Sequence, residues 1–368
     1  MLTIRICSAP VLAILVALLG CSDTGSSPPS RPGPGPVGGD ASVDRNIPPR
    51  PDATVADGDA GSSTSIRSEV CDQSLPMTGS AEDAARAMGL CRFVDEASGE
   101  WGVLSARFTT ADGSGSLDSS EQVGVLPSFG SVNARQGSAL FAMSSGTARA
   151  PGMPGHTSDC DFFGSPFDLS PTDYPAGFPT PSSSCPGIRS GPPFNAAALE
   201  LRIRAPEGAR SFSFASAFFT YEYPEFICSE FNDFFVVLRE NNGAMENIAF
   251  DADGNPVSVN NSFLRACAPG THGGKTFDCP LGREFLRGTG YDGTDVCGSD
   301  DFGFGFPGET AGASTGWLKT TAPVTGGEIL TLRFAIWDSS DPDLDSLVLV
   351  DDFRWELEEA PVETRPLL

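Results

Sequence analysis

The amino-acid sequence predicts an all-β protein, a jelly-roll-like two-sheet β-sandwich with one short N-terminal helix and a disulfide-stapled loop insertion. Three observations lead to this prediction. The 368 residues include 42 Gly and 31 Pro, which interrupt helices and mark turns. Several short runs alternate apolar and polar residues with a period of two, as strands do. Ten Cys are typical of an extracytoplasmic domain that disulfides hold together.

The first 20 residues have the features of a bacterial lipoprotein signal peptide. Arg5 precedes an apolar run over residues 7–19, which is shorter than the roughly 20 residues of a membrane-spanning helix. The run ends in Leu18-Leu19-Gly20-Cys21, which resembles the bacterial lipobox. The resemblance implies that Cys21 carries lipid and anchors the chain to a membrane of the bacterial cell envelope, with the outer membrane or cell surface favoured. The alternative is an ordinary signal peptide with an incidental cysteine.

Residues 21–65 are the predicted tether between the lipid and the folded domain. They are rich in Ser, Pro and Gly, and no Leu or aromatic residue occurs between Cys21 and Leu75. Such a segment buries too little apolar surface to fold. The folded domain is therefore expected over residues 66–358, with a short C-terminal tail over residues 359–368.

One helix is predicted near the start of the domain. Ser80 is a good N-cap residue, and Asp83 three residues later completes a capping-box pattern. The Ala-rich run 81–88 follows, and Gly89 stands where a helix C-terminus favours glycine.

Strands are predicted where the period changes to two or a short run is wholly apolar. The strongest candidates are residues 199–204, 211–218, 234–238, 329–337 and 347–355. Both faces of the continuous apolar run 234–238 are expected to be covered. Turn pairs separate the strands, namely Asn242-Gly243, Asp253-Gly254 and Gly326-Gly327. Segment 143–193 lacks strand periodicity and holds Cys160 and Cys185, so it is the predicted insertion.

Eight cysteines remain when Cys7 leaves with the signal peptide and Cys21 carries lipid. They are Cys71, Cys91, Cys160, Cys185, Cys228, Cys267, Cys279 and Cys297. No close C-x-x-C pair indicates a metal site, so this even number predicts up to four disulfides. Pairing between sequence neighbours is expected, and Cys71–Cys91 is the best-supported pair because it closes one local motif.

The charge balance excludes one class of partner. With 23 Lys and Arg against 48 Asp and Glu, the formal charge is -25, and such a surface repels nucleic-acid phosphates. The two His residues leave little material for a histidine-rich catalytic or zinc site.

Two acidic clusters, at residues 221–233 and 338–352, flank strongly hydrophobic strands. A carboxylate within such a strand is costly unless it is paired or bound to metal. Calcium takes six to eight oxygen ligands and fits such a collection. The sequence therefore predicts a structural calcium site, and the alternative is a solvated acidic turn with backbone hydrogen bonds. The candidate ligands are Glu222, Glu230, Asn232, Asp233, Asp345 and Asp351.

Other motifs indicate no catalytic centre. Residues 312–316 fit G-x-S-x-G, but the next segment is typical of a strand and no His follows His272. Asp251 and Asp253 imitate an EF-hand start, yet the pattern breaks at Pro256 and favours a hairpin turn. A sugar-stacking surface is a further hypothesis, with candidate rings at Tyr221, Tyr223, Trp317 and Trp337.

Several segments together resemble the choice-of-anchor L domain of bacterial surface and secreted proteins. They are residues 219–226, 231–235, 248–251, 254–261, 316–318, 332–338, 345–346 and 350–353. The likeness covers roughly residues 70 to 357. It implies an extracytoplasmic domain joined to a surface anchor, with no general enzymatic activity and no catalytic residues to transfer.

These observations predict a surface-tethered, non-catalytic lipoprotein with a β-sandwich binding or adhesion domain. Its expected partners are the membrane, through the N-terminal lipid, and an extracellular glycan or protein. One alternative is a structural envelope lipoprotein without a specific ligand. A second alternative is a polysaccharide hydrolase, since two of the many carboxylates could have glycosidase spacing.

Overall fold

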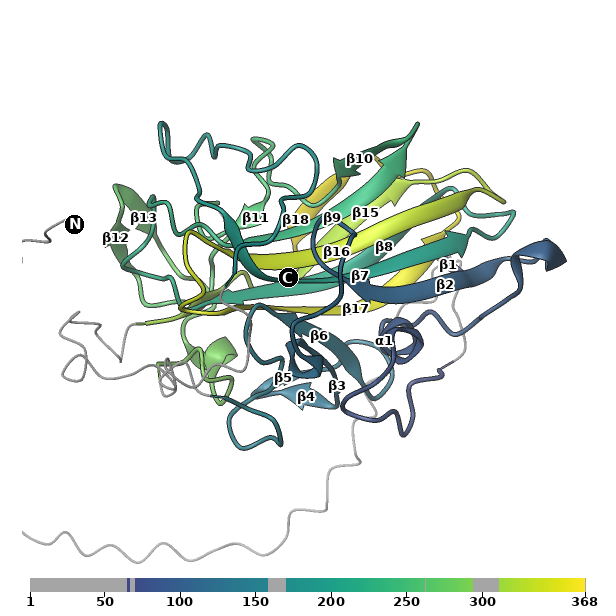
Figure 1. Cartoon of the computed structure of the whole chain (residues 1–368), viewed down its shortest axis with the longest axis horizontal. Helices are drawn as coiled ribbons and strands as arrows, with labels where there is room; N and C mark the ends of the chain where they lie inside the picture. The colour runs from purple at the N-terminus through teal and green to yellow at the C-terminus, as the bar shows by residue number, and fades with distance from the viewer. Residues whose placement is uncertain (1–64, 67–69, 158–169, 262, 294–310, 368) are drawn as a thin grey trace, which may run out of the picture. The chain divides into compact units, whose positions relative to one another are not determined.

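The computed structural model describes residues 65–66, 70–157, 170–261, 263–293 and 311–367. These residues form an all-β sandwich of two antiparallel sheets with one α-helix, which confirms the predicted fold class (Figure 1). No helix of the described part is long and apolar enough to cross a membrane.

The first sheet runs through six strands, and two short strands extend it. In spatial order the six are β18 (Glu363–Pro366), β15 (Leu318–Pro323), β8 (Ser211–Thr220), β17 (Ser346–Glu356), β6 (Leu140–Ser144) and β3 (Val123–Leu126). Strand β1 (Ser65–Ile66) pairs with β17, and β14 (Ala313–Ser314) pairs with β8.

The second sheet contains the long strands of the other layer. In spatial order these are β10 (Ala244–Asn247), β9 (Phe234–Asn241), β16 (Ile329–Ser339), β7 (Pro193–Arg204) and β2 (Gly102–Thr109), and β11 (Val257–Ser258) also pairs with β9. Two hairpins stand apart, β4 (Ser128–Phe129) with β5 (Val132–Asn133) and β12 (Gly270–His272) with β13 (Lys275–Phe277). Short 3-10 turns are η1 (Glu96–Ser98), η2 (Ser120–Gln122) and η3 (Glu284–Leu286).

Strand alternation builds the core between the sheets. Even-numbered residues of β8 and β16 face inward, and their rings meet across the layers, with Phe214 and Phe334 centroids 5.1 Å apart. Odd-numbered residues of β8, such as Phe219, belong to a separate cluster on the outer face of the first sheet. The period of two in the sequence therefore corresponds to two apolar layers.

The helix lies where the sequence predicts it. Helix α1 (Ala81–Ala87) begins after Ser80, whose hydroxyl accepts the backbone N–H of Asp83 in a complete capping box. Gly89 has φ +97°, the left-handed conformation that follows many helix ends. The Met88 carbonyl accepts the backbone N–H of Phe353 at 2.8 Å, which fixes the helix end against β17.

The predicted C-terminal tail over residues 359–368 is wrong, because β18 completes the first sheet. It pairs with β15, and the hydroxyls of Thr364 and Thr320 lie 2.9 Å apart in a buried hydrogen bond. A four-residue edge strand carries too little periodicity to be recognised in the sequence alone.

The two ends of the sandwich differ in their connections. At the turn end, to the right in Figure 1, β7 joins β8 through residues 205–210 and β15 joins β16 through residues 324–328. At the loop end, to the left, β6, β8 and β16 finish and β7, β9 and β17 begin. The long connections gather at the loop end, including residues 145–192 and 221–233.

Disulfides fasten the loop end and the helix. The predicted Cys71–Cys91 bridge is confirmed. Cys185–Cys228 and Cys267–Cys279 also join sequence neighbours, but strict pairing in order is wrong because it would join Cys185 to Cys160 and Cys228 to Cys267. The predicted insertion is therefore fastened to residues 221–233. Cys160 and Cys297 lie outside the described residues, as does Cys21.

The insertion covers the outer face of the second sheet, so residues 234–238 of β9 are buried on both faces as predicted. Trp337 stacks on Phe234 with ring centroids 5.2 Å apart. Phe178 and Tyr174 of the insertion meet the same indole edge-to-face at 5.6 and 6.2 Å. Phe178 also meets the Phe234 ring edge-to-face at 5.9 Å, so three aromatic contacts hold the insertion against the sheet.

Candidate functional site

Four carboxylates gather between the sheets at the loop end, and we call them the inter-sheet acidic cluster. The members are Glu222, Asp233, Asp338 and Asp345, and the last three act electrostatically on one another. Alternation explains two of the positions, because Asp233 continues the inward face of β9 and Asp338 that of β16. Glu222 follows β8 and Asp345 precedes β17, so both sheets contribute.

Asp233 connects three strands. Its Oδ1 accepts the backbone N–H of Ser339 at 3.0 Å, and its Oδ2 accepts the hydroxyl of Ser346 at 2.6 Å. Burial raises the pKa of this carboxyl, and the two hydrogen bonds oppose that rise. Asp233 is a predicted ligand whose oxygens already fasten the starts of β9 and β17 to the end of β16.

Asp338 is a cluster member that is not among the predicted ligands. It is 1% exposed, and among the described residues neither of its carboxylate oxygens has a hydrogen-bond partner. Burial raises its pKa well above the usual value, and the carboxylates of Asp233, Asp345 and Glu222 raise it further. Its signal in the sequence is its phase, two residues after the inward-facing Ile336.

Ser145 lies near Asp338 but has no free proton to donate to its carboxylate. The Ser145 hydroxyl lowers the pKa of Asp338, against the larger effects of burial and of the Asp233 and Asp345 carboxylates. That hydroxyl donates its single proton to the Ser346 carbonyl at 3.1 Å, and it accepts the Ser346 backbone N–H at 2.9 Å. The carboxylate oxygens of Asp338 consequently remain without a donor in the described part.

Glu222 and Asp345, the other two members of the cluster, have little free space around them. Glu222 is 2% exposed, directly after β8. The carboxylate of Asp345 lies over Gly146, in the space that a Cβ at position 146 would occupy. Any larger residue than glycine at position 146 would therefore displace Asp345 from the cluster.

Three predicted ligands do not join the cluster. Glu230 is exposed, and the amide oxygen of Asn232 accepts the Asn260 N–H at 2.8 Å. Asp351 accepts the backbone N–H groups of Arg135 and Gln136 at 2.6 and 3.2 Å. Burial raises the pKa of Asp351 to about 7 in spite of these donors.

The six predicted ligands therefore do not form a single coordination sphere. Across the described ranges, no three His, Cys, Asp or Glu side chains are placed to hold a metal ion together. Nearness in the sequence was a poor guide to the ligand set. Asp345 lies just before β17, whereas Asp351 lies six residues later within that strand and accepts hydrogen bonds from a different loop.

The hypothesis of a sugar-stacking surface at the four named rings is wrong. Tyr221, Tyr223 and Trp337 are almost fully buried. Trp317 is half-buried, and the guanidinium of Arg135 lies 5.5 Å from its ring centroid. The three buried rings stand beside acidic residues in the sequence, yet they are covered by other parts of the protein.

The G-x-S-x-G and EF-hand-like motifs lie in structural segments, and strand β15 follows the first of them as predicted. Ser314, in the G-x-S-x-G pattern, is buried in β14. Asp251 accepts the backbone N–H groups of Asp253 and Asn255 at 3.0 and 2.9 Å, which closes a hairpin turn.

A cavity of about 530 Å³ opens beside the insertion at the loop end. Its lining is Tyr174, Pro179, Thr180, Pro181, Arg189, Ser190, Gly191 and Pro192. One aromatic ring, several prolines and an exposed Arg189 surround the space. This volume and this mixture of apolar surface with a few polar groups are typical of small-ligand sites. We call it the insertion cavity.

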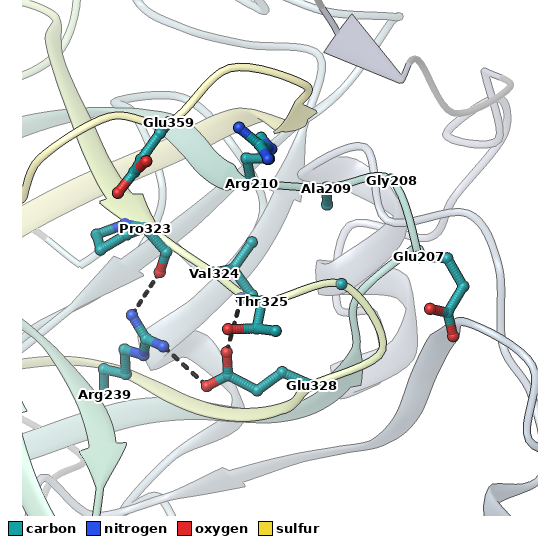
Figure 2. A pocket seen from close by; sticks show the side chains of 11 residues that line it. Glu207, Gly208, Ala209, Arg210, Arg239, Pro323, Val324, Thr325, Glu328 and Glu359 are labelled. Carbon is teal, nitrogen blue, oxygen red and sulfur yellow. Dashed lines mark hydrogen bonds and ion pairs between the residues drawn. The ribbon is translucent and has the colours of Figure 1, made fainter.

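A second cavity, of about 610 Å³, lies at the turn end (Figure 2). The Arg239 guanidinium donates to the Pro323 carbonyl at 2.6 Å and to Glu328 at 2.8 Å. Glu328 also accepts the Thr325 backbone N–H at 2.9 Å, as the dashed lines in Figure 2 show. These groups fasten the β15–β16 turn to β9, and the lining has no aromatic ring.

Comparison of the chain with protein-family models, curated proteins and solved structures found no match in any of the three.

Proposed function

We propose that this chain is a lipid-anchored extracytoplasmic protein of the bacterial envelope, with a non-catalytic binding domain of the choice-of-anchor L type. The support for its location is the lipobox-like sequence ending at Cys21 together with the disulfides, which persist in oxidising compartments. The support for binding is the insertion cavity, whose apolar wall and exposed cation suit a polymer of sugar rings.

The inter-sheet acidic cluster does not support the alternative of a polysaccharide hydrolase. A glycosidase acid and base must touch the scissile bond. Asp233 and Asp338 are at most 1% exposed, so a polysaccharide cannot reach either of them. These two carboxylates therefore cannot be a glycosidase pair, and we assign recognition of an envelope glycan to the insertion cavity.

Replacing Arg189 with Glu is expected to weaken glycan binding at least tenfold, because a guanidinium donor in the cavity wall becomes a repelling carboxylate. The purified protein would be screened against immobilised envelope polysaccharide and peptidoglycan, with affinity measured by surface plasmon resonance. Arg210→Glu is the matched control, since Arg210 is also exposed but lines the cavity at the turn end.

Equal weakening by both variants would indicate a general charge effect and would contradict the assignment to the insertion cavity. Binding to neither polymer favours a structural envelope protein, and release of reducing sugar from either one favours a hydrolase. Capture of a protein alone would replace the glycan in the proposal.

The anchor has its own test. Cells that express the wild-type chain with labelled palmitate are expected to incorporate label into the protein, and Cys21→Ser is expected to abolish incorporation and release the protein from the membrane fraction, since the thiol carries the lipid. Cys7→Ser is the control because Cys7 lies within the signal peptide. Label that persists in Cys21→Ser would exclude this anchor.

A further inference from the structure

Two buried polar side chains at the loop end lack partners in the same neighbourhood. One is Asp338, described above. The other is Asn195, which is 1% exposed and whose Oδ1 has no hydrogen-bond partner among the described residues. Asn195 follows Phe194, the strand partner of Asp338, at an irregularity between β7 and β16. Native proteins rarely leave such groups unpaired, so each requires an explanation.

The backbone around Asn195 is arranged specifically. Asn195 has φ +49°, a conformation that non-glycine residues seldom adopt. The buried Gln122 amide donates to the carbonyls of Asn195 and Ser145 at 2.8 and 3.4 Å. Asn195 is thereby tied to Ser145, which is the serine that acts on Asp338. Residues of both sheets hold this arrangement in place.

The charges acting on Asp338 all have the same sign. Asp233, Asp345 and Glu222 are carboxylates from three other chain segments, so a cation would interact favourably with each of them. The Asp233 oxygens each accept one hydrogen bond and retain lone pairs for a further ligand. What the site has in excess is oxygen atoms and negative charge.

We propose that the inter-sheet acidic cluster binds one calcium ion, with Asp338 and Asp233 as the carboxylate ligands and neutral oxygens such as Asn195 Oδ1 completing its shell. Calcium accepts carboxylate, amide, carbonyl and water oxygens in irregular arrangements, so two carboxylates suffice beside neutral ligands. Zinc prefers nitrogen and sulfur, which the cluster lacks, and magnesium demands a stricter octahedron.

Such an ion would fasten the two sheets to each other at the loop end. Asp233 and Asp338 belong to the second sheet, while Asp345 and Glu222 adjoin β17 and β8 of the first. This inference is independent of the glycan proposal, because it concerns a buried site on the inside of the sandwich.

The test compares thermal unfolding of the purified protein in calcium and in chelator. At a calcium concentration about 100 times the dissociation constant, the midpoint is expected to rise by roughly 5 °C. Equilibrium dialysis with radioactive calcium should find one ion per chain. Asp338→Asn is expected to lose both effects. Asp351→Asn, which changes a buried carboxyl of β17 outside the cluster, should keep both.

Equal midpoints and no bound calcium in the wild type would overturn the proposal. A more stable Asp338→Asn protein with an unchanged wild-type response to chelator would do so too, because it would show that the carboxyl group holds a proton. If Asp338→Asn does not fold, Asp345→Asn gives the same comparison at a less buried member. Its calcium affinity should fall at least tenfold, and an unchanged affinity would count against the site.

Discussion

Replacing Trp337 with Ala is expected to lower the free energy of unfolding by about 3–5 kcal/mol. Trp337 is fully buried, and its indole contacts Phe234, Tyr174 and Phe178. The substitution removes the ring against which the insertion packs and leaves a large cavity that the rigid strands cannot fill. Glycan binding should fall with stability, because Tyr174 belongs to both the aromatic cluster and the cavity wall.

Chemical denaturation with urea measures this effect, and Trp317→Ala is the matched control. Trp317 is half-buried at the edge of the outer cluster, so its loss should cost less than half as much. Similar costs at the two positions would show that the insertion does not depend on the sheet beneath it.

The second large effect is expected when Cys185 and Cys228 are both replaced with Ala. The bridge closes a loop of 43 residues and joins the insertion to the segment beside the acidic cluster, so its loss should cost about 2–4 kcal/mol. Replacing Cys267 and Cys279, which are 12 residues apart, should cost about 1 kcal/mol less, since a shorter loop restricts the unfolded chain less.

Urea midpoints of the two double variants, measured without reductant, check this order. The reverse order would mean that strain or residual structure, and not loop length, controls the contribution of each bridge. A Cys185 and Cys228 variant that binds glycan with unchanged affinity would separate the cavity from its covalent fastening.

The helix and the main strands could be predicted from the sequence because their signals are local. The capping box at Ser80 and the alternation within 199–204 and 211–218 depend on neighbours a few residues apart, and all appear as predicted. Pairing of Cys185 with Cys228 depends on how a long insertion folds back, which no local pattern encodes. Strand β18 depends on a free edge that only the assembled sheet provides.

The members of the acidic cluster could be predicted only in part from the sequence. Two acidic segments and their nearness to hydrophobic strands were evident, and Glu222, Asp233 and Asp345 do come together. Asp338 belongs to the cluster because it continues the inward face of β16, whereas Asp351 lies further along β17 and accepts hydrogen bonds from another loop. Tyr223 and Trp337 failed as surface residues because Tyr223 packs into the main core and the insertion covers Trp337 on the outer face of the second sheet.

The pairing of β1 shows at which end of the sandwich the chain enters. Ser65 and Ile66 pair with Glu356 and Trp355, so the chain enters at the turn end. Strand β17 spans eleven residues from there to the loop end, which separates the two by roughly 36 Å. The chain therefore joins the sandwich at the end opposite the insertion cavity, and a segment attached there leaves the cavity unobstructed.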